Sequence, residues 1–230
     1  MSKTICIIPA RKGSKRIKNK NIINFYGKPI IERVLENLKK FKSFEKIIVS
    51  TNCDKIKKIA QKLNVEVLSR NEKLSNDTTD TRTVIVDAIN KIEKQNLNFD
   101  KVLCVYPTSI FFKINHFKSA LKKLKKKNTY IFSAKEYEHS IFRSFYKQNH
   151  NEIKLNFKTD LSVRTQKLTK TYHDAAQFYL GWKKSWLYNK KIFNKKSDFV
   201  LFPSLDAWDI DDYEDLKVAK DIWKIMKNKK

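Results

Sequence analysis

Short apolar segments alternate with longer amphipathic segments along most of the chain. The apolar segments are rich in β-branched residues, which is typical of strands buried on both faces of a sheet. This pattern predicts strands over residues 4–10, 45–51, 65–69, 101–108 and 129–137. Between them, apolar residues recur at helical spacing and predict helices over residues 28–41, 53–64, 80–95 and 114–127. Strands and helices that alternate with short connections are typical of βαβ units, so we expect an α/β fold with a parallel sheet.

The pattern changes after residue 137. Residues 137–172 are polar, contain several aromatic residues and lack a regular period, so we expect an insertion or arm there. A further strand is predicted over residues 175–182, and the segment from Phe199 onward predicts a strand, an acidic turn and a terminal amphipathic helix. A chain of 230 residues is long enough for one substantial core. We therefore expect residues 1–230 to form a single domain that carries the arm.

Charge and composition suggest one alternative function. The formal net charge is +26, which is compatible with binding to nucleic acid. However, the basic residues are mostly Lys and are spread along the whole chain, whereas base recognition favours Arg, of which there are seven. No segment approaches the roughly 20 apolar residues that span a bilayer, and the N-terminal segment does not resemble a signal peptide. We therefore expect a cytoplasmic protein with neither a nucleic acid nor a membrane as partner.

The first candidate site is the segment "PARKGSKRIKNKN", residues 9–21, which carries six Lys or Arg and no acidic residue. It follows the first predicted strand, and parallel sheets bind ligands beyond the carboxyl ends of their strands. Gly13 is its only glycine, so the segment matches neither of the common glycine-rich nucleotide motifs. A single glycine still lets the backbone approach an anion closely. The residues alone leave two alternatives, a phosphate-binding loop and a solvated basic loop.

The second candidate site is the acidic segment "WDIDDYED", residues 208–215. If Asp209 and Asp211 lie at a strand end, both side chains point to one face, and paired carboxylates are suitable ligands for Mg²⁺. Alternatively, Asp211 and Glu214 have the spacing of a helix-capping box. The two roles are compatible if Asp212 or Glu214 helps the terminal helix to start.

Together these segments resemble the nonulosonic acid cytidylyltransferases, the family that includes the CMP-sialic acid synthetases. The resemblance begins with "IIPARKGSKRIKNKNI" and continues, in the family's order, through "FYGKPIIERVLE", "SRNEKLSNDTT", "VYPTSIFF" and "DIDD". It covers nearly the whole chain. The segment "RTQKLTKTYHDAAQFYLGW", residues 164–182, is most similar to the pseudaminic acid cytidylyltransferase branch.

The resemblance implies a Rossmann-like, mostly parallel sheet flanked by helices, of the nucleotide-diphospho-sugar transferase type. It implies Mg²⁺-dependent transfer of CMP from CTP to a nine-carbon acidic sugar, with pyrophosphate as the second product. Pseudaminic acid is the acceptor that the resemblance favours, and N-acetylneuraminic, legionaminic and keto-deoxyoctulosonic acids are the alternatives. Family members are usually homodimers in which the arm, here residues 137–172, reaches the partner's active site.

The resemblance also implies roles for individual residues. The residues implied to bind the nucleotide and its triphosphate are Arg11, Gly13, Ser14, Lys15, Lys20, Asn21, Arg70, Asp77 and Thr78. The residues implied to line the sugar site are Thr108, Ser109, Arg164, His173, Asp174, Gln177 and Tyr179. Asp209 and Asp211 would hold Mg²⁺. Three cations would assist catalysis by neutralising the departing pyrophosphate: Arg11, Lys15 and Lys20. The fourth catalytic residue, Asp211, would lie near the attacking hydroxyl.

Some positions depart from the family pattern. Lys12 and Ala176 stand where glycine is usual, and Asn52 stands where an aspartate is usual. The other departures are Lys18, Asn19, Asn71, Ile110 and Phe111. None of them replaces the two metal carboxylates or the three catalytic cations, so we expect an active enzyme. Outside these motifs, His116 is expected at the surface.

Overall fold

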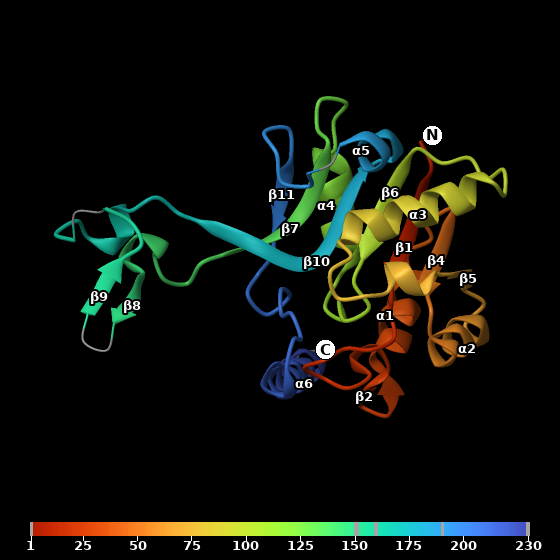
Figure 1. Cartoon of the computed structure of the whole chain (residues 1–230), viewed down its shortest axis with the longest axis horizontal. Helices are drawn as coiled ribbons and strands as arrows, with labels where there is room; N and C mark the ends of the chain where they lie inside the picture. The colour runs from red at the N-terminus through yellow and green to blue at the C-terminus, as the bar shows by residue number, and fades with distance from the viewer. Residues whose placement is uncertain (1, 150–151, 159–160, 190, 229–230) are drawn as a thin grey trace.

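The computed structural model describes residues 2–149, 152–158, 161–189 and 191–228, which form a sheet covered by helices on both faces (Figure 1). In this part of the chain the main sheet has seven strands. In spatial order they are β11 (Asp198–Leu201), β7 (Tyr130–Glu136), β10 (Tyr172–Trp182), β6 (Lys101–Val105), β1 (Thr4–Pro9), β4 (Lys46–Thr51) and β5 (Glu66–Ser69). Only β10 runs antiparallel to its neighbours, β6 and β7. The predicted α/β fold with a mostly parallel sheet is confirmed.

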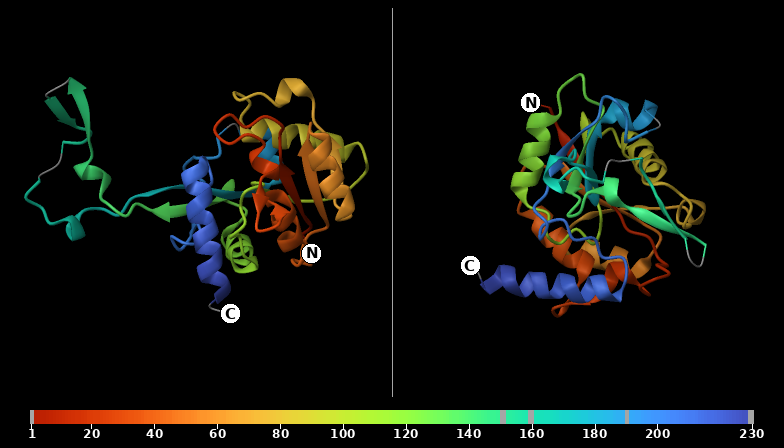
Figure 2. Two further views of the ribbon diagram at one scale, coloured as in Figure 1. Left: turned by 90° about the horizontal axis from the view of Figure 1, so that it is seen from below. Right: turned by 90° about the vertical axis from the view of Figure 1, so that its left-hand side faces the viewer.

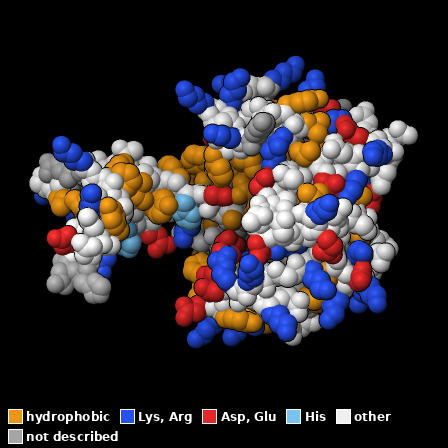
Figure 3. All heavy atoms as spheres, viewed as in Figure 1, with side chains coloured by type: hydrophobic (Ala, Val, Ile, Leu, Met, Phe, Trp, Pro, Cys, Tyr) orange, Lys and Arg blue, Asp and Glu red, His pale blue; other side chains and the backbone are white. Residues whose placement is uncertain are grey.

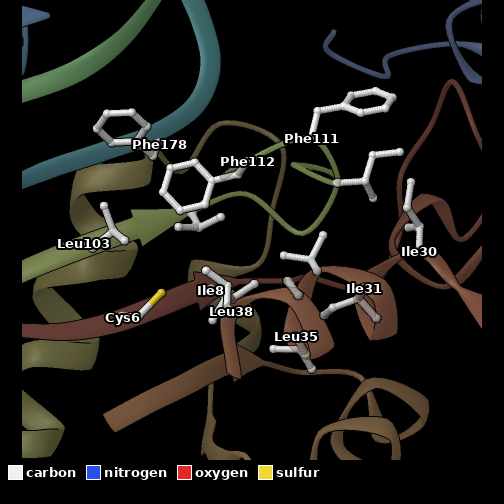
Figure 4. Packing of buried hydrophobic residues seen from close by; sticks show 14 of the residues in the cluster. Cys6, Ile8, Ile30, Ile31, Leu35, Leu38, Leu103, Phe111, Phe112 and Phe178 are labelled. Carbon is white, nitrogen blue, oxygen red and sulfur yellow. The ribbon is translucent and has the colours of Figure 1, made fainter. Parts of the chain in front are cut away.

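The helices divide between the two faces of the sheet. They are α1 (Ile30–Lys39), α2 (Asp54–Lys62), α3 (Thr81–Glu93), α4 (Ile114–Lys123), α5 (Lys183–Tyr188) and α6 (Tyr213–Asn228). Apolar residues of α1, α2, α4 and α6 pack with Cys6 and Ile8 of β1, and those of α3 and α5 pack with Ile5 and Ile7. Figure 4 shows Cys6 and Ile8 in the first of these clusters, together with Leu35 and Leu38 of α1. A strand buried on both faces explains why β1 is a continuous apolar run.

Residues between β7 and the start of β10 leave the body of the molecule (Figures 1 and 2). They contain the hairpin of β8 (Phe145–Asn149) and β9 (Glu152–Leu155) and two short 3₁₀ turns, η3 (Ile141–Arg143) and η4 (Thr165–Lys167). Several large apolar side chains of this segment are exposed, as the apolar surface on the projecting part in Figure 3 shows. We call residues 137–172 the arm. Residues 150–151 and 159–160 of the predicted arm lie outside the described residues.

The remaining short elements lie in the connections from β1 to α1 and from β5 to α3. They are β2 (Asn24–Phe25), β3 (Lys28–Pro29) and the 3₁₀ turns η1 (Lys20–Ile22) and η2 (Glu72–Leu74). Among the described helices, none combines the length and the apolar character needed to cross a bilayer.

The segment between β11 and α6 differs from the prediction in two ways. Asp209 and Asp211 lie in irregular backbone that follows β11 rather than at a strand end. The capping box of α6 is formed by Asp212 and Asp215, whose side chains accept hydrogen bonds from each other's backbone N–H at 2.9 and 3.1 Å. The capping box therefore begins one residue after the predicted pair of Asp211 and Glu214, whereas the predicted contribution of Asp212 to the start of the helix is confirmed.

His116 is buried, contrary to the prediction. It lies in the first turn of α4, where its ring packs on Phe202 and its Nε2 lies 3.4 Å from the carboxylate of Asp206. Burial lowers the pKa of His116 to about 4, so the ring is neutral near pH 7.

Candidate active site

A cavity of about 580 Å³ opens at the carboxyl edge of the parallel strands. The ends of β1 and β6, the basic loop, the start of α3 and the acidic segment before α6 all contribute to its wall. Of the predicted residues, its lining includes Arg11, Ser14, Lys15, Lys20, Asn21, Arg70, Asp77, Thr108, Asp209 and Asp211. Residues distant in sequence are thus brought together by the strand ends, as expected for a parallel sheet.

The basic loop after β1 is held in shape by a few local contacts. Ile17 is fully buried and anchors the loop on the core, and the Asn21 side-chain amide donates to the carbonyl of Arg11 at 2.9 Å. Gly13 has a φ of +87°, a backbone conformation that glycine adopts without strain. Lys12 lies outside the left-handed region, so its replacement of a glycine imposes no strain on the backbone.

Asp77 contacts two of the cations that line the cavity. Its carboxylate pairs with the guanidinium of Arg11 and lies 2.6 Å from the ammonium of Lys15. Hydrogen bonds from Lys15 and Arg11 lower the pKa of Asp77 below its usual value. A triphosphate that bound Arg11 and Lys15 would therefore compete with Asp77 for both.

Arg70 supplies a buried positive charge to the same wall. It is 7% exposed and donates from Nη2 to the carbonyl of Ser50 at 3.2 Å. Its Nε is buried and has no hydrogen-bond partner among the described residues. Burial, with the nearby charge of Arg11, lowers the pKa of Arg70 to about 10, so it stays charged at pH 7. An unpaired buried donor at a cavity wall is suited to an oxygen atom of a ligand.

Asp209 and Asp211 line the same cavity, and Asp211 contacts the basic loop. Asp211 accepts from Arg16 at 2.9 Å and from Lys20 at 3.2 Å, and Lys20 also donates to the carbonyl of Ile210 at 2.8 Å. Burial and the negative charge of Asp211 raise the pKa of Asp209 to about 6. Carboxylate oxygens are donors that a divalent cation takes, so the chemistry of this pair is compatible with Mg²⁺.

The other predicted residues do not line this cavity. Thr78 bonds to Asn76 within its own turn, and Gly13 of the basic loop lines a separate small pocket with Cys53 and Ile56. Ser109 and Gln177 are almost fully buried, and the Ser109 hydroxyl donates to the carbonyl of Gln177 at 2.9 Å. Arg164 is exposed on the arm.

The remaining three residues lie where β10 enters the sheet from the arm. His173 packs on Tyr137 at the root of the arm. The carboxylate of Asp174 accepts from the hydroxyl of Tyr179 and from the backbone N–H of Ala176, the latter at 3.0 Å. Burial raises the pKa of Asp174 above its usual value. This cluster fixes the backbone of β10 beside the cavity.

Several lining residues were not assigned a binding or catalytic role from the sequence. They are Pro9, Arg16, Ile17, Thr79, Thr81, Val84, Tyr106, Pro107 and Ala176. Tyr106 and Pro107 follow β6 and directly precede Thr108. Their position after a predicted strand was the signal in the sequence that could have placed them at the cavity. The Tyr106 hydroxyl lies 2.7 Å from that of Thr81, and burial raises its pKa.

Comparison with known proteins identifies the family. A family model described as cytidylyltransferase matches residues 5–227. Over 225 residues the chain is 36% identical to a protein from Campylobacter jejuni described as pseudaminic acid cytidylyltransferase, with 97% of each chain covered. The chain belongs to the cytidylyltransferase family. The resemblance found in the sequence is thereby confirmed, and the protein is a nucleotidyltransferase.

Other cytidylyltransferases are more distant. A Legionella pneumophila protein described as CMP-N,N'-diacetyllegionaminic acid synthase is 29% identical over 211 residues, which is 90% of each chain. A solved structure of a CMP:2-keto-3-deoxy-manno-octonic acid synthetase, complexed with CTP, superposes with a TM-score of 0.71 at 12% identity. That superposition covers 98% of this chain and 100% of the other. At this identity the likeness shows the fold alone.

Proposed function

We propose that this cytidylyltransferase transfers CMP from CTP to a nine-carbon acidic sugar, with pseudaminic acid as the expected acceptor and pyrophosphate as the second product. The observation that supports this most is the composition of the cavity wall, where five cations and three carboxylates surround about 580 Å³. Cations suit a triphosphate, and a carboxylate pair suits the divalent ion that accompanies it. The 36% identity to a pseudaminic acid cytidylyltransferase supports the choice of sugar.

In the proposed reaction the anomeric hydroxyl of the sugar attacks the α-phosphorus of CTP in line with the departing pyrophosphate. Arg11, Lys15 and Lys20 neutralise the triphosphate oxygens, and Arg70 adds a buried positive charge beside them. Asp211 is the proposed acceptor of the hydroxyl proton. Asp209 and Asp211 would hold Mg²⁺, which supplies additional charge stabilisation at the phosphate oxygens.

We further propose a homodimer in which each arm completes the partner's sugar site. Arg164 is exposed on the arm, outside the lining of its own cavity, and large apolar side chains of the arm, including Phe145, Ile153 and Leu161, are also exposed. Exposed apolar surface of this kind is typical of an interface. The cytoplasm is the proposed compartment, which agrees with three free, buried cysteines.

The test is pyrophosphate release with CTP and Mg²⁺, measured in parallel with pseudaminic, legionaminic, N-acetylneuraminic and keto-deoxyoctulosonic acids. Release chiefly with pseudaminic acid is expected, with loss of turnover on addition of EDTA. Release with another of the four would keep the mechanism and replace the acceptor. No release with any of them, and no stabilisation by CTP, would overturn the proposed function.

The metal assignment has its own test in two variants. Asp209→Ala and Asp211→Ala should each lower kcat by about 100-fold or more, since each removes a charged ligand of the proposed Mg²⁺. Near-normal turnover of both variants would contradict the assignment.

A further inference from the structure

Gln177 lies at a junction of four segments of the fold although it does not line the cavity. It is 1% exposed. Its backbone N–H donates to the hydroxyl of Ser133 at 2.9 Å, and its carbonyl accepts from the hydroxyl of Ser109 at 2.9 Å. Its side-chain Nε2 donates to the carbonyls of Ala175 at 3.0 Å and Trp208 at 3.3 Å.

The chemistry of these contacts fixes the orientation of the amide. Both neighbours of Nε2 are carbonyl oxygens, which only accept hydrogen bonds, so the NH₂ group must face them. Its Oε1 is buried without a hydrogen-bond partner among the described residues. The side chain is thus held by its two donor contacts, one of which reaches the residue that precedes Asp209.

The segment that carries Asp209 and Asp211 depends on contacts with other parts of the fold to fix its backbone. Residues 202–212 have no helix or strand to fix their backbone. On one side of Asp209 the carbonyl of Trp208 accepts from Gln177, and on the other the carbonyl of Ile210 accepts from Lys20 at 2.8 Å. Asp209 is therefore flanked by two backbone carbonyls that are each held by a side chain from another part of the fold.

We propose that Gln177 is a positioning residue for the metal site rather than a ligand of the sugar. It links the backbone of β10 beside the cavity to the segment that aims Asp209 at the divalent cation. This inference rests on the proposed function of Asp209 and Asp211. A sugar ligand would set the affinity for the acceptor, whereas a positioning residue sets the affinity for the metal and the rate.

The test compares Gln177→Met, which keeps the length of the side chain and removes both donors, with Ser109→Ala as matched control. Ser109→Ala removes a contact to the backbone of the same residue but leaves the link to Trp208 intact. Three quantities are measured in each full-length variant: Mn²⁺ affinity in the presence of CTP, the KM for the sugar with kcat, and hydrogen exchange of residues 203–212 without metal.

For Gln177→Met we expect Mn²⁺ affinity to fall about tenfold and kcat to fall with it, because residues that orient metal ligands typically have effects of this size. Exchange of residues 203–212 should rise, and the sugar KM should stay within about twofold. For Ser109→Ala we expect Mn²⁺ affinity within about twofold of the wild type. If Gln177→Met does not fold, Gln177→Glu is measured instead, with the same expected result.

A raised sugar KM with unchanged Mn²⁺ affinity would overturn the inference and make Gln177 a sugar ligand. Unchanged exchange of residues 203–212 would overturn it as well. The proposed metal site is tested separately in the same assay by Asp209→Asn. If Asp209→Asn abolishes Mn²⁺ binding while Gln177→Met leaves it unchanged, the proposed function stands and the inference fails.

Discussion

At the scale of single residues, Asp209 is placed where its charge costs stability. Burial and Asp211 raise its pKa from 3.8 to about 6. A carboxyl group with a raised pKa favours the folded state at low pH, and this contribution is lost as the pH rises from about 4 to about 6. At pH 7 the cost is on the order of 1–3 kcal/mol. A bound cation would offset it.

We therefore expect Asp209→Asn to be more stable than the wild type at pH 7 without metal, by about 1–3 kcal/mol, while it is inactive. At pH 4, where the wild-type carboxyl is protonated, the two free energies of unfolding should agree. Urea denaturation in EDTA at both pH values measures this. Asp221→Asn on α6, which is exposed, serves as control and should show no such pH dependence. Equal free energies of unfolding for Asp209→Asn and the wild type at pH 7 would contradict the claim that the buried charge of Asp209 costs stability.

Ala176 carries strain of a different kind. Its φ is +49°, in the left-handed region, and it occupies the irregularity in β10 between Asp174 and Tyr179. A side chain in this region costs about 1–2 kcal/mol relative to glycine, part of which is offset by the greater freedom of glycine in the unfolded chain. Ala176→Gly should raise the free energy of unfolding by up to about 1 kcal/mol. Thermal and urea denaturation would detect the gain, and a destabilised variant would contradict the strain argument.

At the scale of elements, the sequence predicted the strands and helices well because buried strands and amphipathic helices leave periodic patterns. Ile5 and Ile7 face one cluster of core residues, and Cys6 and Ile8 face the other, which explains a continuous apolar run. The capping box of α6 was predicted one residue too early because two acidic pairs have capping spacing, Asp211 with Glu214 and Asp212 with Asp215. Contacts of Asp211 with Arg16 and Lys20 leave the cap to Asp212, and such distant contacts are not visible in local sequence.

The two sides of the candidate site were predictable to different degrees. Charged residues of the basic loop and the acidic segment line the cavity, since their position after strands places them at its edge. On the sugar side, motif similarity cannot tell a residue that faces the cavity from one that faces the core. Tyr106 lines the cavity, whereas Ser109 and Gln177 are buried behind it. Thr79 lines it in place of Thr78, although the side-chain oxygen of Asn76 accepts hydrogen bonds from the hydroxyls of both.

Asn52 connects the basic loop to η2. Its Oδ1 accepts from the backbone N–H of Lys12 in the basic loop, and its Nδ2 donates to Glu72 of η2, both at 2.9 Å. An aspartate, usual here in the family, could accept from Lys12 but would repel Glu72. Asn52→Asp should therefore loosen the loop and raise the KM for CTP by about threefold to tenfold, a change worth one exposed hydrogen bond.

The double variant tests this explanation for Asn52. In Asn52→Asp with Glu72→Gln, the new amide can donate to the new carboxylate, so the contact is restored with its polarity reversed. We expect the KM for CTP of the double variant to return to within about twofold of the wild type. Glu72→Gln alone serves as control. A double variant as impaired as Asn52→Asp would show that the carboxylate acts in some other way.

At the scale of the whole molecule, the arm carries large apolar side chains that contacts within one chain leave exposed. It projects from the body in Figure 1 and in the left view of Figure 2, and Figure 3 shows apolar surface on it. It carries Phe145, Ile153 and Leu161, whose exposed fractions are 59%, 66% and 52%. Burial of such side chains in a dimer would contribute roughly 1.5–3 kcal/mol for each fully covered side chain. A second copy of the chain, with the same arm and the same cavity, offers a symmetric interface.

If each arm completes the partner's site, a mixed dimer should recover activity that neither variant has alone. Asp209→Asn disables the cavity of its own subunit, and Arg164→Ala disables the arm. In a heterodimer of the two, the cavity that keeps Asp209 faces the arm that keeps Arg164, so one of two sites is complete. We expect about half of the wild-type turnover per heterodimer, purified with two different tags, against nearly none for each homodimer. An arm that served its own cavity would leave both sites of this heterodimer incomplete, and turnover would stay at the level of the homodimers. Full activity of the Arg164→Ala homodimer would instead remove Arg164 from the sugar site.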